Sequence, residues 1–404
     1  MASMRPLDGI RVVGLTNAIA GPMTCHILAE YGAEVIKVES NTRPDGLRLS
    51  APFAGGVAHV DRGGRFAPYS GSVLSMAVNL NHPGGPAFVK RLVSRSDVLV
   101  ENFAPGVLAK HGLSFDSFVA ERPDLVMLSL SIFGLTGPNS ALPGLGTDLA
   151  ALTGFASMTG WPDRGPSLPQ GAYTDFIIPP LAACAILAAL EHREATGQGL
   201  YIDLAEYEAA LWFLLPQLLD SAANGRAPSR PGNRMARGAP HQLFRCGGDD
   251  RWCAIAIADD EQWRTLCRLI GRPELGDDPR FATYPARIAY NAELTAVVEA
   301  WTEQRSPHEV MDLLQRHGLE AGAAQSAEDL HEDPQLAHRG HFRLLDHPEM
   351  GASYYQALPI RLPEIEPQWK PAPCLGEHTY DICHRVLGLS DEEIVQFIDD
   401  NVLY

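Results

Sequence analysis

Apolar positions in the first forty residues predict a strand, a helix and a second strand. Residues 10–15 form an apolar run, and an amphipathic stretch then extends over residues 20–31. Gly32 follows this stretch, where a left-handed residue commonly ends a helix. Residues 33–39, "AEVIKVE", then form the second predicted strand. This order and spacing predict a right-handed βαβ unit, so both strands belong to a parallel sheet.

Further strands and helices alternate along the next part of the chain. Residues 75–103 follow a strand-helix-strand pattern, and residues 123–134 are largely apolar on both alternating sets of positions, as in a strand buried on both faces. A long apolar run begins after Asp175, and its two early prolines are compatible with the first turn of a helix. Residues 200–219 add a strand and a helix. The alternation predicts an α/β fold.

From about Ser229 the pattern changes. Residues 228–241 are rich in Pro, Gly and Arg, as in a linker, and residues 242–258 surround a Gly-Gly-Asp-Asp turn, as in a hairpin. Helical periodicity continues in segments 260–271, 292–304, 306–318 and 390–401. We therefore expect a large domain over residues 1–225, a small α+β domain over 226–325, and a linker with a return to the large domain over 326–404.

Composition narrows the classes of function. The chain has 404 residues, a net charge of −17 and 46% hydrophobic residues, which is typical of a globular protein. Nucleic-acid binding is not expected, because phosphate backbones require a basic face. A small anionic ligand remains compatible with this charge, since a few local cations or backbone N–H groups bind one pyrophosphate.

Other sequence signals bear on location and metals. The N-terminus lacks the pattern of a signal peptide. The apolar run 176–190 is short for a membrane span and contains two prolines, so a buried core helix is expected rather than a membrane contact. Seven cysteines form no CxxC pair, and the histidines lack metal-ligand spacing. We expect a cytoplasmic protein without disulfides or a metal site.

Three stretches could form a site. Asp175 is either a helix cap or a carboxylate kept from water for chemistry. Residues 20–22 open a helix after a strand, where open α/β sheets receive phosphates, although the spacing is not GxGxxG. Residues 101–106 follow another strand at the same expected edge and also fit a plain turn. From the residues alone these alternatives stay open.

Taken together, several stretches in one order resemble the family III coenzyme A transferases, which include formyl-CoA transferase, carnitine CoA-transferase and alpha-methylacyl-CoA racemase. The similarity extends from about Leu7 to Leu389. The motifs that carry it are "LDGIRVVGLTNAIAGPMTCHILAEYGAEVIKVE", "DVLVENFAPGVLAKHGL", "SIFGLTGP", the Asp175 segment with "REATGQGLYIDL", "GRPELGDDPRFAT" and "LGEHT".

The resemblance implies a particular architecture. It predicts a Rossmann-like large domain whose parallel sheet is built from both chain ends, a smaller α+β domain from the middle, and two subunits interlocked as a homodimer. A heteromer with a paralogous subunit is the alternative assembly. Acyl-CoA and organic acids are the expected substrates, with no permanently bound cofactor.

The resemblance also implies roles for individual residues. The family's nucleophilic aspartate matches Asp175, which would attack an acyl-CoA thioester and then carry CoA as an aspartyl thioester. Contacts with coenzyme A are expected from the residues that match those of formyl-CoA transferase: Asn17, Ala20, Val78, Asn81, Asn102, Phe103 and Lys110.

The sequence departs from known branches at several positions. Ile19 replaces a glutamine beside the acyl group of formyl-CoA transferases, and Ser40 replaces an arginine of their CoA site, so formyl-CoA and oxalate are not expected substrates. Racemases carry a histidine where this chain has Leu145 or Thr147, which favours the transferase branch over a racemase or isomerase. A non-catalytic CoA-binding subunit is the other alternative.

The acids exchanged are less constrained. The "GAYTDF" context is similar to members that act on succinyl-CoA and substituted dicarboxylic acids. Three basic residues near expected site loops, Arg164, Arg234 and Arg237, could clamp a second carboxylate or be solvated surface side chains.

Overall fold

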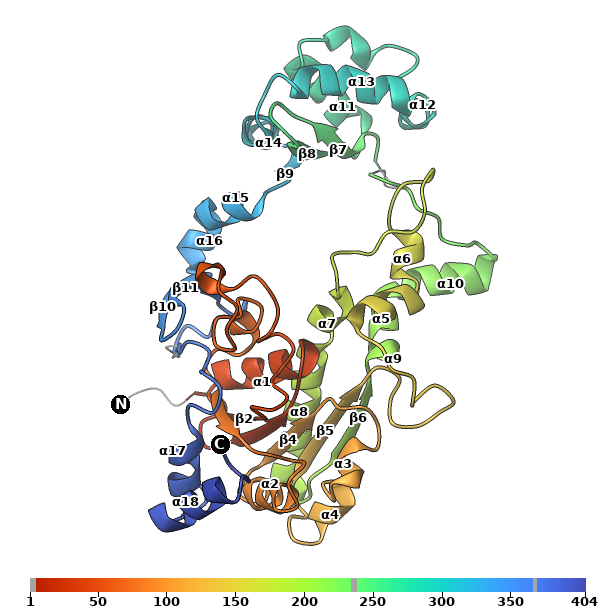
Figure 1. Cartoon of the computed structure of the whole chain (residues 1–404). Helices are drawn as coiled ribbons and strands as arrows, with labels where there is room; N and C mark the ends of the chain where they lie inside the picture. The colour runs from red at the N-terminus through yellow and green to blue at the C-terminus, as the bar shows by residue number, and fades with distance from the viewer. Residues whose placement is uncertain (1–4, 234–237, 366–368) are drawn as a thin grey trace. The chain divides into compact units, whose positions relative to one another are not determined.

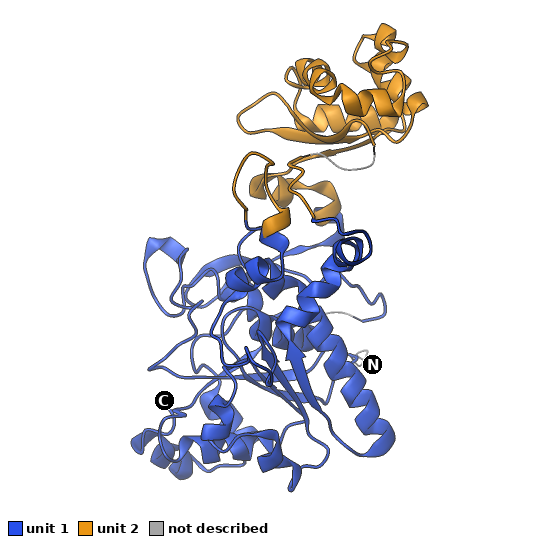
Figure 2. Cartoon of the chain, turned by 90° about the vertical axis from the view of Figure 1, so that its right-hand side faces the viewer, with its two compact units in different colours: residues 1–156, 168–227, 337–404 blue, residues 157–167, 228–336 orange. Residues whose placement is uncertain are grey.

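The computed structural model of the chain describes residues 5–233, 238–365 and 369–404 (Figure 1). It divides into two compact units (Figure 2). Unit 1 comprises residues 1–156, 168–227 and 337–404, and unit 2 comprises residues 157–167 and 228–336. The limits at 227 and 336 lie near the sequence-based limits of 225 and 325. The segment 157–167 joins unit 2, which no sequence pattern indicated.

Unit 1 is built on a six-stranded parallel sheet in the order β3-β2-β1-β4-β5-β6. The strands are β1 (Arg11–Leu15), β2 (Glu34–Glu39), β3 (Leu74–Ala77), β4 (Val98–Glu101), β5 (Val126–Ser131) and β6 (Tyr201–Ala205). The predicted α/β class with a parallel sheet is confirmed. From β1 the chain adds β2 and β3 on one side and then β4, β5 and β6 on the other, so the switch point of the sheet lies between β1 and β4. Open sheets of this kind bind ligands at the carboxyl ends of the strands beside the switch point.

Alternating side chains of the strands pack under helices on both faces. Val12 faces α1 (Ala20–Glu30) and α8 (Pro179–Thr196), whose Leu28 and Ile186 are buried with it. Val13 faces the opposite side, where the sheet packs against α2 (Gly85–Val93), α4 (Phe115–Val119), α17 (Thr379–Arg385) and α18 (Asp391–Asp399). Burial on both faces explains why these strands are apolar at successive positions.

The expectation that the sheet is built from both chain ends is wrong. All six strands come from residues 11–205, and within the described part of residues 337–404 no strand joins the sheet. That part adds α17, α18 and a separate antiparallel pair, β10 (Phe342–His347) with β11 (Gly351–Gln356). Ser390 caps α18: its hydroxyl oxygen accepts from the backbone N–H of Glu393, and the carboxylate of Glu393 accepts from the backbone N–H of Ser390. Beyond α18, Leu403 forms one isolated antiparallel bridge with Val78, next to β3.

Unit 2 contains the predicted hairpin, β7 (His241–Arg245) with β8 (Trp252–Ala256). A third antiparallel strand, β9 (Glu320–Ala323), was not predicted, because this short segment lacks an apolar alternation. The helices are α11 (Asp260–Leu269), α12 (Tyr284–Ala289), α13 (Asn291–Thr302), α14 (Pro307–Arg316) and α15 (Ala327–Glu332). Helices α11, α13 and α14 contribute to a core around the buried ring of Trp263.

Unit 1 contains further helices. They are α3 (Val107–Lys110), α5 (Gly146–Leu152), α7 (Tyr173–Ile177), α9 (Glu206–Leu211) and α10 (Leu215–Asn224), with α6 (Phe155–Met158) and α16 (Pro334–Arg339) at unit boundaries. The sequence predicted one helix after Asp175. Instead Asp175 lies inside the short helix α7, and α8 begins at Pro179.

Candidate active site

The switch point of the sheet is closed by a reciprocal pair of hydrogen bonds. Oδ1 of Asn102, just after β4, accepts from the backbone N–H of Asn17, just after β1, at 2.8 Å. Nδ2 of Asn102 donates to the carbonyl of Asn17 at 2.9 Å. The side chain also lies against Gly21, where a Cβ atom would come within 2.8 Å of its Cγ. The two loops singled out in the sequence are therefore joined.

The loop after β1 is held in a strained conformation. Ala18 has φ = 59°, which costs a residue with a Cβ atom roughly 1–2 kcal/mol. The backbone N–H of Ala18 donates to Oδ1 of Asp45 at 3.2 Å, and Oδ2 of the same carboxylate accepts from buried Lys37 at 3.0 Å. Sequence analysis did not find this support, because Asp45 is 27 residues from the loop in sequence.

A cavity of about 300 Å³ opens beside these loops. Its walls come from the loops after β1 and β4, the end of β5, the segment before α5, and single residues of α7 and α9. Figure 1 places α5, α7 and α9 next to one another at this end of the sheet. Ile19, Phe103, Ile132 and Leu142 contribute apolar surface. The arrangement suits a ligand with an extended, partly apolar arm.

Asp175 faces this cavity while nearly removed from water. Its exposure is 8%, and Oδ1 has no hydrogen-bond partner within the described ranges. Burial raises the pKa of this carboxyl group to about 6. A carboxylate that has lost its hydration shell and gained no hydrogen bond at one oxygen is a stronger nucleophile than one in water.

A glycine allows the carboxyl group to sit there. Thr174 donates its hydroxyl to the carbonyl of Gly146 at 3.1 Å, which holds α7 against the first residue of α5. A Cβ atom on Gly146 would overlap Oδ1 of Asp175 and lie 2.8 Å from the Cβ of Ala172. Only glycine fits this contact. Spacing in the sequence carried no sign of it.

Glu206 is a second buried acid of the cavity, and sequence analysis missed it. It is the first residue of α9, directly after β6, and is 6% exposed. Burial and the negative charge of Asp175 raise the pKa of Glu206 to about 8. An acid in the first turn of a helix usually interacts with the helix dipole, so the sequence pattern gave no separate signal.

Two charged residues act on the hydroxyl group of Tyr69. The ring of Tyr69 packs 5.8 Å from that of Phe176, the residue after Asp175. Burial raises the pKa of Tyr69, the charge of Arg65 lowers it, and the charge of Asp175 raises it. Both charged groups therefore act on one hydroxyl group. Arg65 is exposed.

A sequence profile of CoA-transferase family III matches residues 7–379. The chain belongs to this family. Curated relatives in this family are named CoA-transferases, so the cavity with its buried aspartate belongs to a chain of a CoA-transferase family.

Curated relatives and a solved structure agree with the assignment. A probable CoA-transferase of Mycobacterium tuberculosis is 34% identical over 99% of this family III chain, which spans half of that longer protein. A succinyl-CoA–D-citramalate CoA-transferase of Chloroflexus aurantiacus is 32% identical over 96% of both chains. Two relatives from that organism, 32% and 31% identical over 96% of this chain, are named alpha and beta subunits of a succinyl-CoA–L-malate CoA-transferase; this chain covers 85% and 96% of them.

The solved structure is that of a CAIB/BAIF family protein from Brucella suis. It is 32% identical to this chain, with a TM-score of 0.87, and the match covers 95% of this chain and 100% of the other. The overall fold of unit 1 and unit 2 is therefore one already known in this family.

The structure brings some of the expected CoA contacts of this family III chain to the cavity and leaves others outside it. Asn17, Ala20, Asn102 and Phe103 line the cavity together with Asp175. The other three are not among its lining residues: Val78 is buried in the core, while Asn81 and Lys110 are exposed. Of the basic residues considered for a second carboxylate, Arg164 belongs to unit 2, and Arg234 and Arg237 lie outside the described residues.

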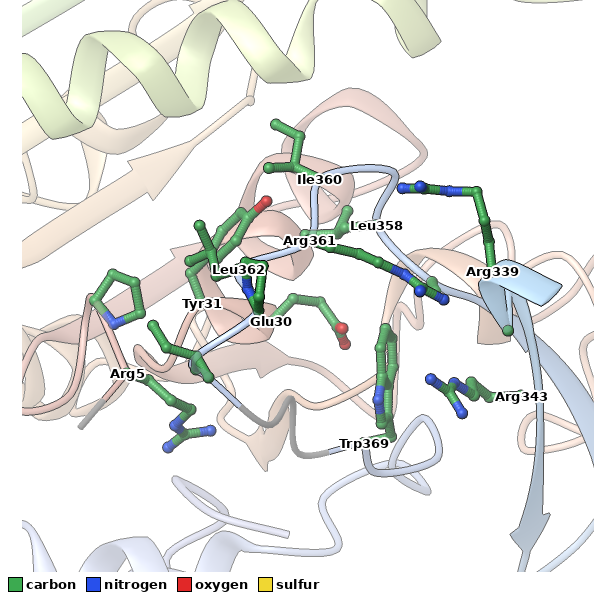
Figure 3. Close-up of a pocket in the computed structure, with 15 residues that line it drawn as sticks. Arg5, Glu30, Tyr31, Arg339, Arg343, Leu358, Ile360, Arg361, Leu362 and Trp369 are labelled. Atoms are coloured by element: carbon green, nitrogen blue, oxygen red, sulfur yellow. The ribbon is translucent and has the colours of Figure 1, made fainter. Parts of the chain in front are cut away.

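A second cavity of about 300 Å³ lies at the C-terminal end of α1 (Figure 3). Arg343 and Arg361 lie beside the ring of Trp369, Arg339 lines the cavity farther from that ring, and Glu30 points toward the interior. None of the expected site residues lines it. Because α1 begins at the carboxyl edge of the sheet and ends at the opposite edge, this cavity is separate from the one that contains Asp175.

Proposed function

We propose that this protein transfers coenzyme A from an acyl-CoA donor to an organic acid through an aspartyl-CoA thioester on Asp175. The observation that carries the proposal is the buried carboxylate in a cavity at the switch point. Its raised pKa of about 6 leaves it mainly ionised at neutral pH, while burial keeps water away.

Each chemical step conserves atoms and charge. An oxygen of Asp175 attacks the thioester carbonyl of the donor, forming a mixed anhydride and releasing the CoA thiolate. The thiolate attacks the aspartyl carbonyl carbon of the anhydride, giving the aspartyl thioester and the free donor acid. The acceptor carboxylate then attacks the thioester, and the same two steps run in reverse. The reaction divides one difficult exchange into acyl transfers at one residue.

Water exclusion decides whether such a route is productive. A mixed anhydride hydrolyses readily, so a reaction site open to solvent would lose the intermediate. The apolar lining from Ile19, Phe103, Ile132 and Leu142 supports a water-poor environment around the carboxylate. Asn102 joins the loops after β1 and β4, and loops that are held together in this way would keep the pantetheine arm in a fixed position.

The substrate class is proposed as succinyl-CoA and a second dicarboxylic acid. Relatives named for succinyl-CoA support this choice. Arg65, whose charge acts on Tyr69 beside Phe176, is the proposed partner of the distal carboxylate. Succinyl-CoA and butyryl-CoA differ at the distal carboxylate. We expect Arg65→Gln to reduce the preference for succinyl-CoA over butyryl-CoA by about tenfold, as for one charge-assisted contact. An unchanged preference in steady-state assays would contradict the role of Arg65.

An acyl-CoA racemase or isomerase is the second candidate, because two carboxyl groups of different pKa face one cavity. Such a pair suits acid-base chemistry at an α-carbon. At the position where racemases carry a histidine base, however, this chain has Leu145 or Thr147. No histidine lines the cavity within the described residues. Deuterium incorporation at the α-carbon of an acyl-CoA without transfer of CoA would support this alternative.

Isotope exchange tests the transferase directly. Deuterium-labelled succinate should enter succinyl-CoA in the presence of the wild-type protein. The variant Asp175→Ala should lose this exchange and still bind CoA in calorimetry, because the loop residues Asn17 and Asn102 are unchanged. Exchange by Asp175→Ala at the wild-type rate would refute the mechanism.

We also propose a homodimer that works in the cytoplasm, with a heteromer as the alternative suggested by the relatives named as subunits. Trp212, Leu215 and Leu219 expose large apolar surfaces at the start of α10 and just before it, as subunit interfaces do. Segment 173–196 is long and apolar enough for a membrane span. Because α8 buries Ala182 and Ile186 against the sheet, we propose a core helix.

A further inference from the structure

Glu206 is placed as a functional group and not as a helix-capping acid. The residue is 6% exposed and lines the same cavity as Asp175. No hydrogen bond or ion pair to its side chain occurs among residues that the structure describes. Glu208, two residues later in the same first turn, is exposed. A solvated acid would serve the helix dipole equally well, so the burial of Glu206 needs another reason.

The charges around Glu206 make its neutral form the stable one. On the elements packed against α9, Asp148 of α5 caps the N–H of Leu145, and Asp203 of β6 accepts from the N–H of Leu135. Asp175 of α7 is the charged residue that acts on Glu206. Two carboxylates in one water-poor cavity repel each other, so one proton remains on the pair. The pKa values, about 6 for Asp175 and about 8 for Glu206, place that proton on Glu206 at neutral pH.

We propose that Glu206 is a second catalytic carboxyl group, which stays protonated and donates a hydrogen bond to the oxyanions that form during acyl transfer at Asp175. This inference rests on the proposed transferase function. The negative charge of each tetrahedral intermediate is borne by a former carbonyl oxygen, either of the substrate or of Asp175. A neutral acid facing the cavity stabilises that charge as the collapse of the intermediate expels thiolate or carboxylate. The proton stays on Glu206 throughout, and no covalent bond is formed there.

The charges of the cavity lining agree with this role of Glu206. The described residues offer no positive side chain among the cavity linings, although anionic intermediates form there. Ser131 also lines the cavity, and its buried hydroxyl lacks a partner within the described ranges. Neutral donors stabilise an oxyanion without neutralising the nucleophilic carboxylate, whereas a cation would pair with Asp175 and weaken its attack.

Three variants separate a chemical role from a structural one. Glu206→Gln keeps the shape and an N–H donor but cannot ionise, Glu206→Leu removes the donor, and Glu208→Gln is the matched control on the same helix. The assay is the exchange of labelled succinate into succinyl-CoA over a range of pH. The wild-type rate should fall at acid pH as Asp175 is protonated and fall again above about pH 8 as Glu206 ionises.

The expected pattern is specific. Glu206→Gln should lose the alkaline fall and keep the acid one, with kcat within about tenfold of the wild type at pH 7, because an amide N–H still donates. Glu206→Leu should lose roughly 100-fold in kcat with little change in KM. Glu208→Gln should match the wild type throughout. Retention of the alkaline fall in Glu206→Gln, or a wild-type kcat in Glu206→Leu, would overturn the proposal.

Asp175→Ala keeps the two proposals distinguishable. If Asp175→Ala is inactive while Glu206→Leu is fully active, the transferase proposal stands and the role of Glu206 is refuted. If Asp175→Ala is fully active, the transferase mechanism itself is refuted. Melting curves and CoA-binding calorimetry of every variant identify loss of folding. If Glu206→Leu does not fold, the pH profile of Glu206→Gln still decides the question.

Discussion

The position of Asp175, the proposed nucleophile, depends on a residue without a side chain. Gly146 begins α5, and its hydrogen atom occupies the space where a Cβ would overlap the carboxyl group of Asp175. We predict that Gly146→Ala shifts Asp175 enough to reduce kcat for CoA transfer by about 100-fold, since displacements near 1 Å have effects of that size.

Gly165→Ala is the control for this substitution. A Cβ atom there would have no neighbour within 4 Å, and Gly165 does not have a positive φ. In steady-state assays, the kcat of Gly165→Ala should equal that of the wild type. Equal kcat values for the two alanine variants would contradict the packing role of Gly146.

Ionised Asp175 also reduces stability. Its pKa is raised from 3.8 to about 6, so the folded protein binds more protons than the unfolded chain between these pH values. Stability therefore falls as pH rises through that interval, by about 3 kcal/mol at 1.36 kcal/mol per pKa unit. We predict that Asp175→Asn raises Tm at pH 7.5 and that the gain shrinks toward pH 4. A gain independent of pH would contradict this cause.

At the scale of elements, Asn102 joins two loops that line the cavity. Asn102→Ala removes both bonds to Asn17, which contribute about 2 kcal/mol together. We predict a lower Tm and a KM for acyl-CoA raised by about tenfold, with Asp175 still acylated. Asn102→Asp keeps the acceptor and loses the donor. Its Tm and its KM for acyl-CoA should therefore lie between those of Asn102→Ala and those of the wild type. Unchanged KM values in both variants would refute the role of this link.

The strands and the positions of these loops could be predicted from the sequence. Continuous apolar runs mark strands buried on both faces, and the carboxyl ends of parallel strands meet at one edge. The break between α7 and α8 was missed because one apolar run continues through Ile178, which ends the first helix and begins the second.

The second acid was beyond the reach of local patterns. Glu206 and Glu208 occupy the same helical turn, and only packing against α7 and the cavity buries the first and exposes the second. Gly146 gave no signal for the same reason: its neighbour Asp175 lies 29 positions later in the numbering of the sequence. Asp175 itself was found through resemblance, since an acid before an apolar run also fits a cap.

At the scale of the whole molecule, the exposed apolar residues near α10 predict assembly. Light scattering should give twice the 43.8 kDa mass of one chain if the proposed dimer forms. We predict that Trp212→Glu combined with Leu219→Glu shifts the protein toward monomer, because charges would replace large exposed apolar surfaces. Val395→Glu, at an exposed site on α18, is the control. A monomeric wild-type protein would refute the homodimer, and an unaffected mass in the double variant would exclude this surface.

Trapping of the covalent intermediate tests the central claim most directly. The protein is incubated with succinyl-CoA, treated with borohydride, digested and analysed by mass spectrometry. Reduction of an aspartyl thioester converts Asp175 to homoserine, so we predict this change in the peptide that contains residue 175, only when donor is present. An unmodified Asp175 during active turnover, or a thioester on another residue, would contradict the account.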